Sequence, residues 1–235
     1  LLSDEAGAWM RGDVLGILCA KALGIAAVAT PVSSNSALEL SGDFAQVRRT
    51  RIGSPFVIDA MNGLLASAES ACGYEANGGF ILGSTVEAPA GPLGALPTRD
   101  AVLPMIAVLA DARKQGLSLT ALQATLPARY TYSERLQNFP TKDSQALLAR
   151  LQQGDEAEVL ERLTAQFGDL AGKAVAFNAI DGLRTTFEGG DVIHLRPSGN
   201  APELRCYTES SDPVRVASLN EAVLASIPAM AETVG

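Results

Sequence analysis

The sequence predicts an α/β three-layer domain followed by a smaller α+β domain with an antiparallel sheet. Three observations lead to this prediction. A chain of 235 residues exceeds the usual length of one domain, about 100 to 200 residues. Short apolar runs alternate with helical patterns as far as about residue 128, and such alternation is typical of α/β layers. Beyond that point, two helical patterns precede four short apolar runs separated by turn residues, which indicates an antiparallel meander.

The first stretch, LLSDEAGAWMRGD, indicates the end of a strand, a turn and the approach to a helix. It has neither an initiator methionine nor a basic-then-apolar signal pattern, so we expect that sequence preceding the strand is missing. A buried helix is predicted from Asp13, a residue type that caps helices, to Gly24, because VLGILCAKAL is apolar on more than one face.

The rest of the α/β domain is predicted from shorter signals. The run IAAVATP ends at Pro31 and fits an interior strand of a parallel sheet, and GGFILGS fits a second buried strand. FVIDAMNGLLAS fits either a helix or a strand. Thr98 and Asp100 can cap a helix that ends at Gly116, and Pro104 lies in its first turn, where proline breaks few hydrogen bonds.

The second domain begins with residues 129–142, which show little periodicity and are interpreted as a connection. Helices are predicted for SQALLARLQQG and EAEVLERLTAQFG, each closed by a glycine, and for residues 213–230. Turns at 181–182 and 189–190 separate the intervening strands, and Asp181 and Asp191 are interpreted as turn residues.

Composition excludes several classes of function. A net charge of -8 without a cluster of basic and aromatic residues argues against nucleic acid as a partner, and no apolar run is long enough to span a membrane. Three separated cysteines without a C-x-x-C pair argue against disulfides or a thiolate zinc site and favour a reducing cytoplasm. His194 is the only histidine, so the chain cannot build a histidine-rich metal site, and we interpret His194 as structural.

The loop RPSGNAPELR, residues 196–205, joins two predicted strands and is rich in groups that donate hydrogen bonds to an anion. Gly199 and Asn200 tolerate backbone angles that turn N–H groups inward, and Ser198 adds a hydroxyl. Arg196 and Arg205 can meet phosphate oxygens with planar guanidinium groups. The loop is therefore a candidate phosphate site; an ordinary hairpin loop with surface arginines is the alternative.

A second loop, GYEANGGF at residues 73–80, precedes a predicted buried strand. Its glycines permit close backbone approach, the Glu75 carboxylate can accept hydrogen bonds from two vicinal hydroxyls, and the Asn77 amide can donate and accept. This combination suits a sugar. A structural glycine-rich turn is the alternative. Arg51, in TRIGSP, is a further candidate for ligand contact.

Taken together, with the sugar loop preceding the phosphate loop by about 120 residues, the two loops resemble those of the α-D-phosphohexomutase family, the phosphomannomutases and phosphoglucomutases. GDVLGILCA, TRIGSPFVIDAM and RDAVLPMIAVL extend the resemblance across the chain. The family has four domains, and the resemblance implies that residues 1–24 are the tail of the second domain. It implies that residues 25–128 are the third domain, with the sugar-binding loop. Residues 129–235 then form the fourth, an α+β domain like the TATA-box-binding protein, with the phosphate-binding loop.

The resemblance also implies an activity, the interconversion of mannose 6-phosphate and mannose 1-phosphate through a phosphoserine enzyme and a hexose 1,6-bisphosphate intermediate. Glu75 and Asn77 are then expected to read sugar hydroxyls, while Arg196, Ser198, Gly199, Asn200 and Arg205 hold the phosphate that is not transferred. The catalytic serine and the Mg²⁺ loop of the family are not visible in this sequence, and we expect both upstream. A hexose phosphate is the expected substrate, and the expected oligomeric state is a monomer or a homodimer.

The sequence departs from the family pattern at three positions. The common sugar loop has serine in place of Asn77 and histidine in place of Gly79, and the common phosphate loop has threonine in place of Asn200. Loss of the histidine removes one candidate proton carrier. The alternatives are a sugar-phosphate-binding module without catalysis, or a phosphoglucomutase or phosphoglucosamine mutase.

Overall fold

The structure, a computed structural model, describes residues 2–88 and 91–232. The chain divides into two compact units, unit 1 (Leu1–Ala128) and unit 2 (Arg129–Gly235), each with its own sheet and core. The outermost bounds of the expected domains, residue 1 and residues 233–235, lie outside the described residues, as do residues 89–90.

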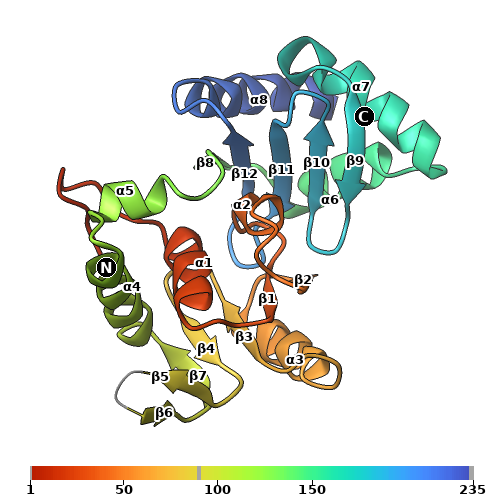
Figure 1. Cartoon of the computed structure of the whole chain (residues 1–235). Coiled ribbons are helices and arrows are strands. Elements are labelled where there is room, and N and C mark those ends of the chain that lie inside the picture. The colour runs from red at the N-terminus through yellow and green to blue at the C-terminus, as the bar shows by residue number, and fades with distance from the viewer. Residues whose placement is uncertain (1, 89–90, 233–235) are drawn as a thin grey trace. The chain divides into compact units, whose positions relative to one another are not determined.

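Unit 1 contains a mixed sheet of five strands (Figure 1). In order across the sheet these are β2 (Gln46–Thr50), β1 (Ala27–Pro31), β3 (Ala71–Tyr74), β4 (Phe80–Leu82) and β7 (Leu96–Asp100). The first three are parallel, and β4 pairs antiparallel with β3 and with β7. The predicted strands at IAAVATP and GGFILGS are confirmed as β1 and β4.

The described part of unit 1 also contains five helices and a separate pair of short antiparallel strands. These are α1 (Gly12–Ala22), α2 (Ala37–Leu40), α3 (Ser54–Leu64), α4 (Leu103–Gln115), α5 (Leu119–Gln123) and the pair β5 (Val86–Ala88) and β6 (Gly91–Leu93). The ambiguous run FVIDAMNGLLAS is therefore helical, with proline in its first turn, where a missing N–H costs no hydrogen bond.

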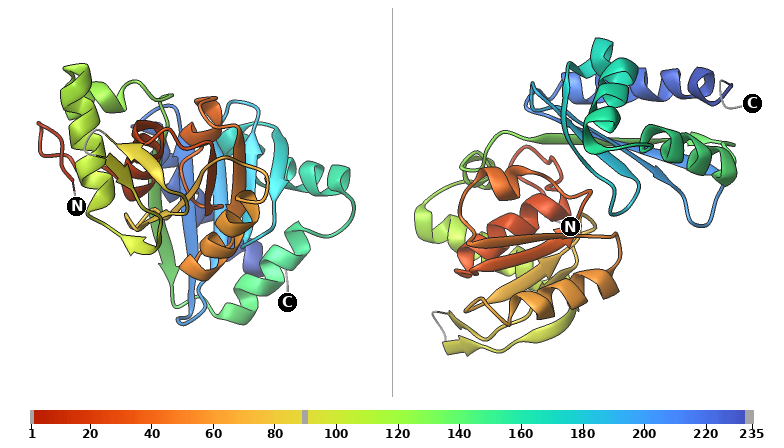
Figure 2. Two further views of the ribbon diagram at one scale, coloured as in Figure 1. Left: turned by 60° about the horizontal axis from the view of Figure 1, so that its bottom comes forward. Right: turned by 90° about the vertical axis from the view of Figure 1, so that its right-hand side faces the viewer.

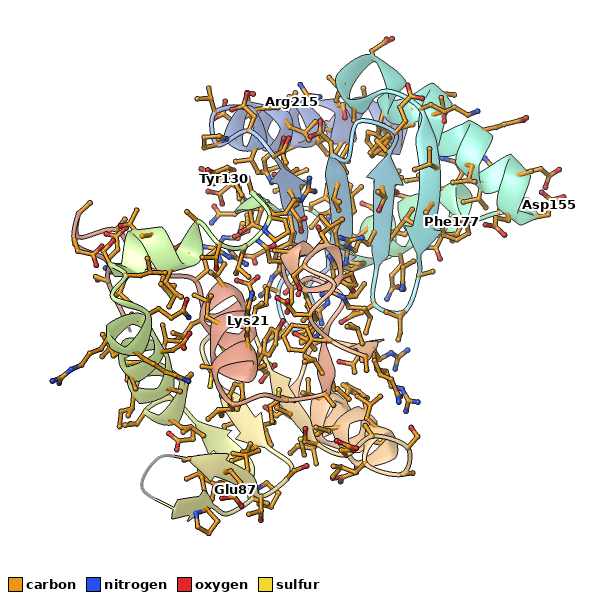
Figure 3. All side chains as sticks on the ribbon, viewed as in Figure 1. Lys21, Glu87, Tyr130, Asp155, Phe177 and Arg215 are labelled. Carbon is orange, nitrogen blue, oxygen red and sulfur yellow. The ribbon has the colours of Figure 1, made fainter. Side chains whose placement is uncertain are left out.

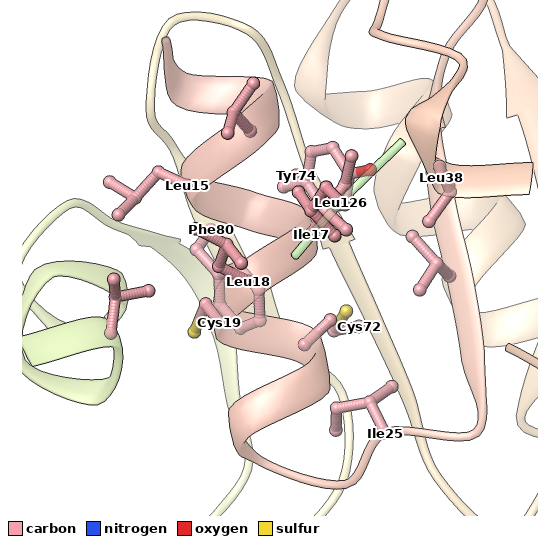
Figure 4. Close-up of a cluster of buried hydrophobic side chains, with 14 of the residues drawn as sticks. Leu15, Ile17, Leu18, Cys19, Ile25, Leu38, Cys72, Tyr74, Phe80 and Leu126 are labelled. Atoms are coloured by element: carbon pink, nitrogen blue, oxygen red, sulfur yellow. The ribbon is translucent and has the colours of Figure 1, made fainter. Parts of the chain in front are cut away.

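The central strands of the unit 1 sheet, β1, β3 and β4, are buried on both faces, and alternate side chains along a strand enter opposite cores. Val28 joins the apolar cluster formed with α1 and α4, whereas its neighbours Ala27 and Ala29 join a separate cluster with α3. Figure 4 shows the first cluster, in which Leu18 and Tyr74 are at most 2% exposed. Two apolar layers about the central strands explain why β1 and β4 read as continuous apolar runs.

The ends of α4 and α1 differ in part from the prediction. Asp100 Oδ1 accepts hydrogen bonds from the N–H groups of Val102 (2.6 Å) and Leu103 (3.2 Å), and Gly116 ends the helix in the left-handed conformation, as predicted. Thr98 is not a cap, because it lies within β7. The Asp13 cap was also wrong: Arg11 is the N-cap residue, and Asp13 is buried in the first turn of α1.

Residues preceding α1 pack within unit 1. A bridge between Ser3 and Trp9 closes a short turn, and the Glu5 carboxylate accepts hydrogen bonds from the N–H groups of Leu119 (2.5 Å) and Thr120 (3.1 Å) at the start of α5. Backbone N–H groups of Glu5 itself, Leu119 and Thr120 lower the pKa of this carboxyl to about 2. The segment thus caps a helix more than a hundred residues away.

Unit 2 is an antiparallel sheet with three helices against one face (Figure 2). Its strands in spatial order are β8 (Tyr130–Gln137), β12 (Glu203–Ser210), β11 (Val192–Pro197), β10 (Leu183–Phe187) and β9 (Ala174–Asn178). The helices are α6 (Thr141–Leu151), α7 (Glu156–Ala171) and α8 (Arg215–Glu232). The predicted meander of four strands and the terminal helix are confirmed.

Three predictions for unit 2 were wrong. Helix α6 ends at Leu151 with Gln152 as its C-cap residue, so Gly154 does not close it. Residues 129–142 are not only a connection, because β8 pairs with all eight residues of β12; its side chains are mostly exposed, so it lacks the apolar alternation of a half-buried strand. Helix α7 continues past Gly168 to Ala171 and ends at Gly172. Its other end has a capping box from Asp155, labelled in Figure 3, and Glu158.

The described residues also show the state of the cysteines and whether a membrane-spanning helix or a metal-binding cluster is present. All three cysteines are buried and free, and burial raises the pKa of the Cys206 thiol to about 12. Within residues 2–88 and 91–232, no helix combines the length and apolar character needed to cross a bilayer. The same residues contain no group of three or more His, Cys, Asp or Glu side chains placed to hold a metal ion.

Candidate functional site

In unit 1 the loop at residues 75–79 forms a tight turn between β3 and β4. The Glu75 N–H donates to the Gly79 carbonyl (3.0 Å), and the Gly78 N–H donates to the Glu75 carbonyl (3.0 Å). Asn77 Oδ1 accepts from the Gly79 N–H (3.0 Å), so its oxygen braces the turn and its amide nitrogen remains to donate outward. Gly78 has φ of +92°, a conformation that favours glycine.

Glu75 is a buried carboxylate held from one side. It is 6% exposed, and its Oε2 accepts a hydrogen bond from Ser54 Oγ (2.8 Å) and lies 3.8 Å from Arg99 Nη1. Glu75 Oε1 has no partner among the described residues. Because both contacts use the same oxygen, the carboxylate is fixed in orientation while its second oxygen can still accept hydroxyl hydrogens.

Helix α1 supports this turn through close backbone contact. A Cβ atom added at Gly12 would lie 2.5 Å from Gly78 Cα and closer still to the Gly78 nitrogen. One added at Gly16 would lie 2.6 Å from Tyr74 Cδ2 and closer still to Tyr74 Cγ. A cavity of about 300 Å³ opens beside the turn; its lining includes Trp9, Met10, Arg11, Asn77, Gly78 and Met105. The turn is therefore positioned by glycines outside it as well as within it.

In unit 2 the loop between β11 and β12 presents unpaired donors. The Ser198 N–H donates to the Glu203 carbonyl (2.9 Å), which closes the base of the loop. Ser198 is 1% exposed, and its Oγ has no hydrogen-bond partner among the described residues. The N–H groups of Gly199 and Asn200 likewise have no partner there, and both residues are exposed. An anion would satisfy a buried hydroxyl that otherwise carries a desolvation cost of about 1–3 kcal/mol.

Arginines stand at the base of this loop in register on three neighbouring strands. Arg196 on β11 is directly opposite Arg205 on β12, and Arg205 is directly opposite Arg135 on β8. Directly opposed like charges destabilise a sheet. The outer two have acidic partners, Asp181 at 2.8 Å from Arg196 Nε and Glu203 at 3.4 Å from Arg135 Nη1. Arg205 has no partner within the described part of the chain, so the row can accept an anion.

The structure thus brings Glu75 and Asn77 together in unit 1, and Arg196, Ser198, Gly199, Asn200 and Arg205 together in unit 2. Sequence reasoning missed Ser54, Arg99 and Asp181 as partners of these residues. Ser54 and Arg99 lie in TRIGSPFVIDAM and RDAVLPMIAVL, two segments of the family resemblance, and Asp181 was interpreted only as a turn residue. Arg51 lies 5.8 Å from the Phe56 ring centre, a cation–π contact.

The chain thus joins a mixed α/β unit, with a tight turn at Glu75 and Asn77, to an antiparallel unit whose loop between β11 and β12 offers hydrogen-bond donors. Two family models match this chain. Residues 11–130 match "Phosphoglucomutase/phosphomannomutase, alpha/beta/alpha domain III", and residues 138–226 match the C-terminal domain of the same enzymes. The chain belongs to the phosphoglucomutase/phosphomannomutase family, the α-D-phosphohexomutases.

Two phosphomannomutases are similar to this chain over almost its whole length. A phosphomannomutase of Salmonella muenchen is 44% identical over 97% of this chain and 46% of its own length. A phosphomannomutase of Sinorhizobium fredii is 45% identical over 91% of this chain and 44% of its own length. The chain therefore spans about half the length of these relatives.

A solved structure of Aspergillus fumigatus N-acetylphosphoglucosamine mutase, in complex with GlcNAc-6P and magnesium, is similar in fold. It superimposes with a TM-score of 0.60 at 15% identity, covering 95% of this chain and 48% of that protein. At this identity the likeness concerns the fold alone.

Proposed function

We propose that this chain supplies sugar and phosphate recognition in a phosphohexomutase that interconverts mannose 6-phosphate and mannose 1-phosphate. The observation that carries the proposal is the loop at 196–205, where a buried, unpartnered Ser198 hydroxyl lies beside arginines in register. The two phosphomannomutases at 44% and 45% identity support mannose as the sugar.

The proposed role of unit 2 is to hold the phosphate that is not transferred. The Ser198 hydroxyl and the N–H groups of Gly199 and Asn200 donate to phosphate oxygens, and the guanidinium groups of Arg196 and Arg205 neutralise the charge. All of these contacts address the phosphate and none requires the sugar ring. A bisphosphate intermediate that reverses its orientation can therefore present either phosphate to the same loop.

The proposed role of unit 1 is to read the sugar. The fixed Glu75 carboxylate offers Oε1 to vicinal hydroxyls, and the Asn77 amide nitrogen donates to a hydroxyl oxygen. Where the common family loop has a histidine, this chain has Gly79, and a Cβ added there would be crowded by Arg99 Cδ (3.1 Å) and Asn77 Oδ1 (3.2 Å). Proton transfer by a side chain at position 79 is thus not part of the proposal.

The described residues do not fit Mg²⁺, since they include no cluster of carboxylates placed to hold a metal ion. The proposal therefore assigns Mg²⁺ and the phosphoserine to the region upstream of this chain. A magnesium complex of the Aspergillus mutase supports Mg²⁺ in the family reaction. Hexose 1,6-bisphosphate as intermediate, a cytoplasmic location and a monomeric or homodimeric state remain predictions.

The domain assignment is also a proposal. Residues 25–128 and 129–235 are proposed as the third and fourth family domains, and residues 1–24 as the tail of the second. The finer description of unit 2 as similar to the TATA-box-binding protein is supported by an antiparallel sheet with helices on one face.

A mutase assay of the natural gene product tests the proposal. We expect Mg²⁺-dependent conversion of mannose 1-phosphate to mannose 6-phosphate, and loss of most activity in Arg196→Ala. Conversion of glucosamine phosphates in preference to mannose phosphates would replace the substrate assignment. Tight binding of mannose 6-phosphate without any turnover would favour a non-catalytic binding module.

A further inference from the structure

The turn between β9 and β10 is seated directly on the strand that carries Arg196. Gly182 in this turn has φ of +80°, and a Cβ added there would lie 3.0 Å from Arg196 Cα and closer to the Leu195 carbonyl oxygen. Only glycine lets the turn approach so closely. The turn therefore sits against the base of the loop at 196–205, although it comes from another hairpin.

Asp181, the residue before this glycine, contacts Arg196 in a particular way. Its Oδ1 accepts a hydrogen bond from Arg196 Nε at 2.8 Å, and both side chains are largely buried, at 17% and 20% exposed. The two terminal nitrogens of Arg196 have no partner in the described part of the chain. A guanidinium held through Nε keeps its terminal edge available, which is the edge that binds a phosphate with two parallel hydrogen bonds.

His194, two residues before Arg196 on β11, fixes the backbone of the same turn. It is 1% exposed, and its Nε2 lies 2.7 Å from the Asp181 carbonyl oxygen. Burial lowers the pKa of the imidazole to about 4, so at neutral pH the ring is uncharged and Nε2–H donates to that carbonyl. Packing against the Tyr207 ring, 5.3 Å between centres, holds its orientation.

We propose that Asp181 is a positioning residue for phosphate recognition, which holds Arg196 in its binding orientation before the phosphate arrives. The proposal rests on the function proposed above, because it assumes that Arg196 contacts phosphate. Holding the side chain in advance spares the entropy of ordering it on binding, about 0.5–1.5 kcal/mol for a flexible side chain.

Removing Asp181 should change phosphate affinity in the opposite direction to the one that simple electrostatics predicts. Asp181 is an anion close to a site for an anion, so its charge by itself weakens phosphate binding. If only charge mattered, neutralising Asp181 would tighten binding. If Asp181 positions Arg196, removing it weakens binding, and the sign of the change distinguishes the two effects.

The test is a calorimetric titration of the 235-residue chain with mannose 6-phosphate and with inorganic phosphate. The variants are Asp181→Ala, Asp181→Asn and Arg196→Ala. Asp191→Asn is the matched control, because Asp191 also lies beside a hairpin turn of unit 2 and accepts from an arginine Nε, that of Arg215, at 2.5 Å. Thermal melts establish that each variant is folded, and Asp181→Asn serves if the alanine variant is not.

We expect Asp181→Ala to weaken binding of both ligands by about 3- to 10-fold. Asp181→Asn should weaken it less, because an amide oxygen can still accept from Arg196 Nε. The control should bind like the wild type. In ¹⁵N NMR of the free chain, the Arg196 Nε–Hε signal should be protected from exchange in the wild type and lose that protection in Asp181→Ala.

Unchanged or tighter binding in Asp181→Ala, with weaker binding in Arg196→Ala, would overturn the positioning role while leaving the phosphate loop intact. Absence of binding by the wild-type chain, or equal binding by Arg196→Ala, would overturn the proposed function together with this inference. A loss in the Asp191→Asn control equal to that in Asp181→Asn would show that any lost ion pair has the effect, and would also reject the positioning role.

Discussion

A methyl group added at Gly12 should displace the sugar loop, although Gly12 belongs to α1. The added Cβ in Gly12→Ala would lie 2.5 Å from Gly78 Cα, whereas ordinary contacts begin at 3.4 Å, so the backbone must separate by roughly 1 Å. No flexible side chain can yield, because the contact is with backbone.

Overpacking of this kind costs about 1–3 kcal/mol, and the lower chain entropy of alanine in the unfolded state offsets about 0.4–1 kcal/mol. We therefore expect Gly12→Ala to be destabilised by about 1–2 kcal/mol. Mannose 6-phosphate should also bind more weakly, because the turn that carries Glu75 and Asn77 moves with Gly78.

Urea denaturation and calorimetry of the 235-residue chain measure the two effects. Gly94→Ala is the matched control, because a Cβ at Gly94 meets nothing within 4 Å and its φ is not positive. The control should be neutral or slightly more stable. If Gly12→Ala unfolds at the same urea concentration as Gly94→Ala, the close approach of α1 to the loop is refuted.

Three further predictions concern single side chains of unit 2. The pKa of His194 is about 4 in the fold against about 6.5 unfolded, so stability is lost as pH falls below 6.5, by about 3 kcal/mol once pH is below 4. The NMR signal of this sole histidine should not titrate near 6.5, and titration there would contradict its burial. Glu209→Ala should cost about 3–5 kcal/mol in denaturant unfolding, because Arg129 Nε, 2.6 Å away, is left buried without its anion; a loss under 1 kcal/mol would oppose this. Asp155→Ala removes the capping box of α7 and should cost about 1 kcal/mol without altering phosphate affinity.

The strands and helices of unit 1 were predictable where burial on both faces leaves a continuous apolar run. This holds for β1 and β4. Helix α4 is buried on one face only and was predictable from the residues at its ends, Asp100 and Gly116. Strand β8 was not predictable in this way. It is held by pairing with β12, more than sixty residues later, and its exposed side chains carry no apolar alternation.

The site was predictable in its loops but not in their supports. The residues of both loops are adjacent in sequence, so glycine, asparagine and arginine in one short stretch already indicate their chemistry. Ser54 reaches Glu75 across 21 residues and Asp181 reaches Arg196 across 15. These contacts depend on which segments become neighbours in the fold, and a local sequence pattern does not contain that information.

Whether residues 196–205 bind phosphate can be measured by calorimetric titration of the 235-residue chain with mannose 6-phosphate, repeated with Arg196→Ala. We expect saturable binding by the wild type and a loss of about 10- to 100-fold in the variant, since a charge-assisted hydrogen bond contributes about 1.5–3 kcal/mol. Equal affinity of the two proteins, or no binding by the wild type, would contradict the assignment of residues 196–205 as a phosphate site.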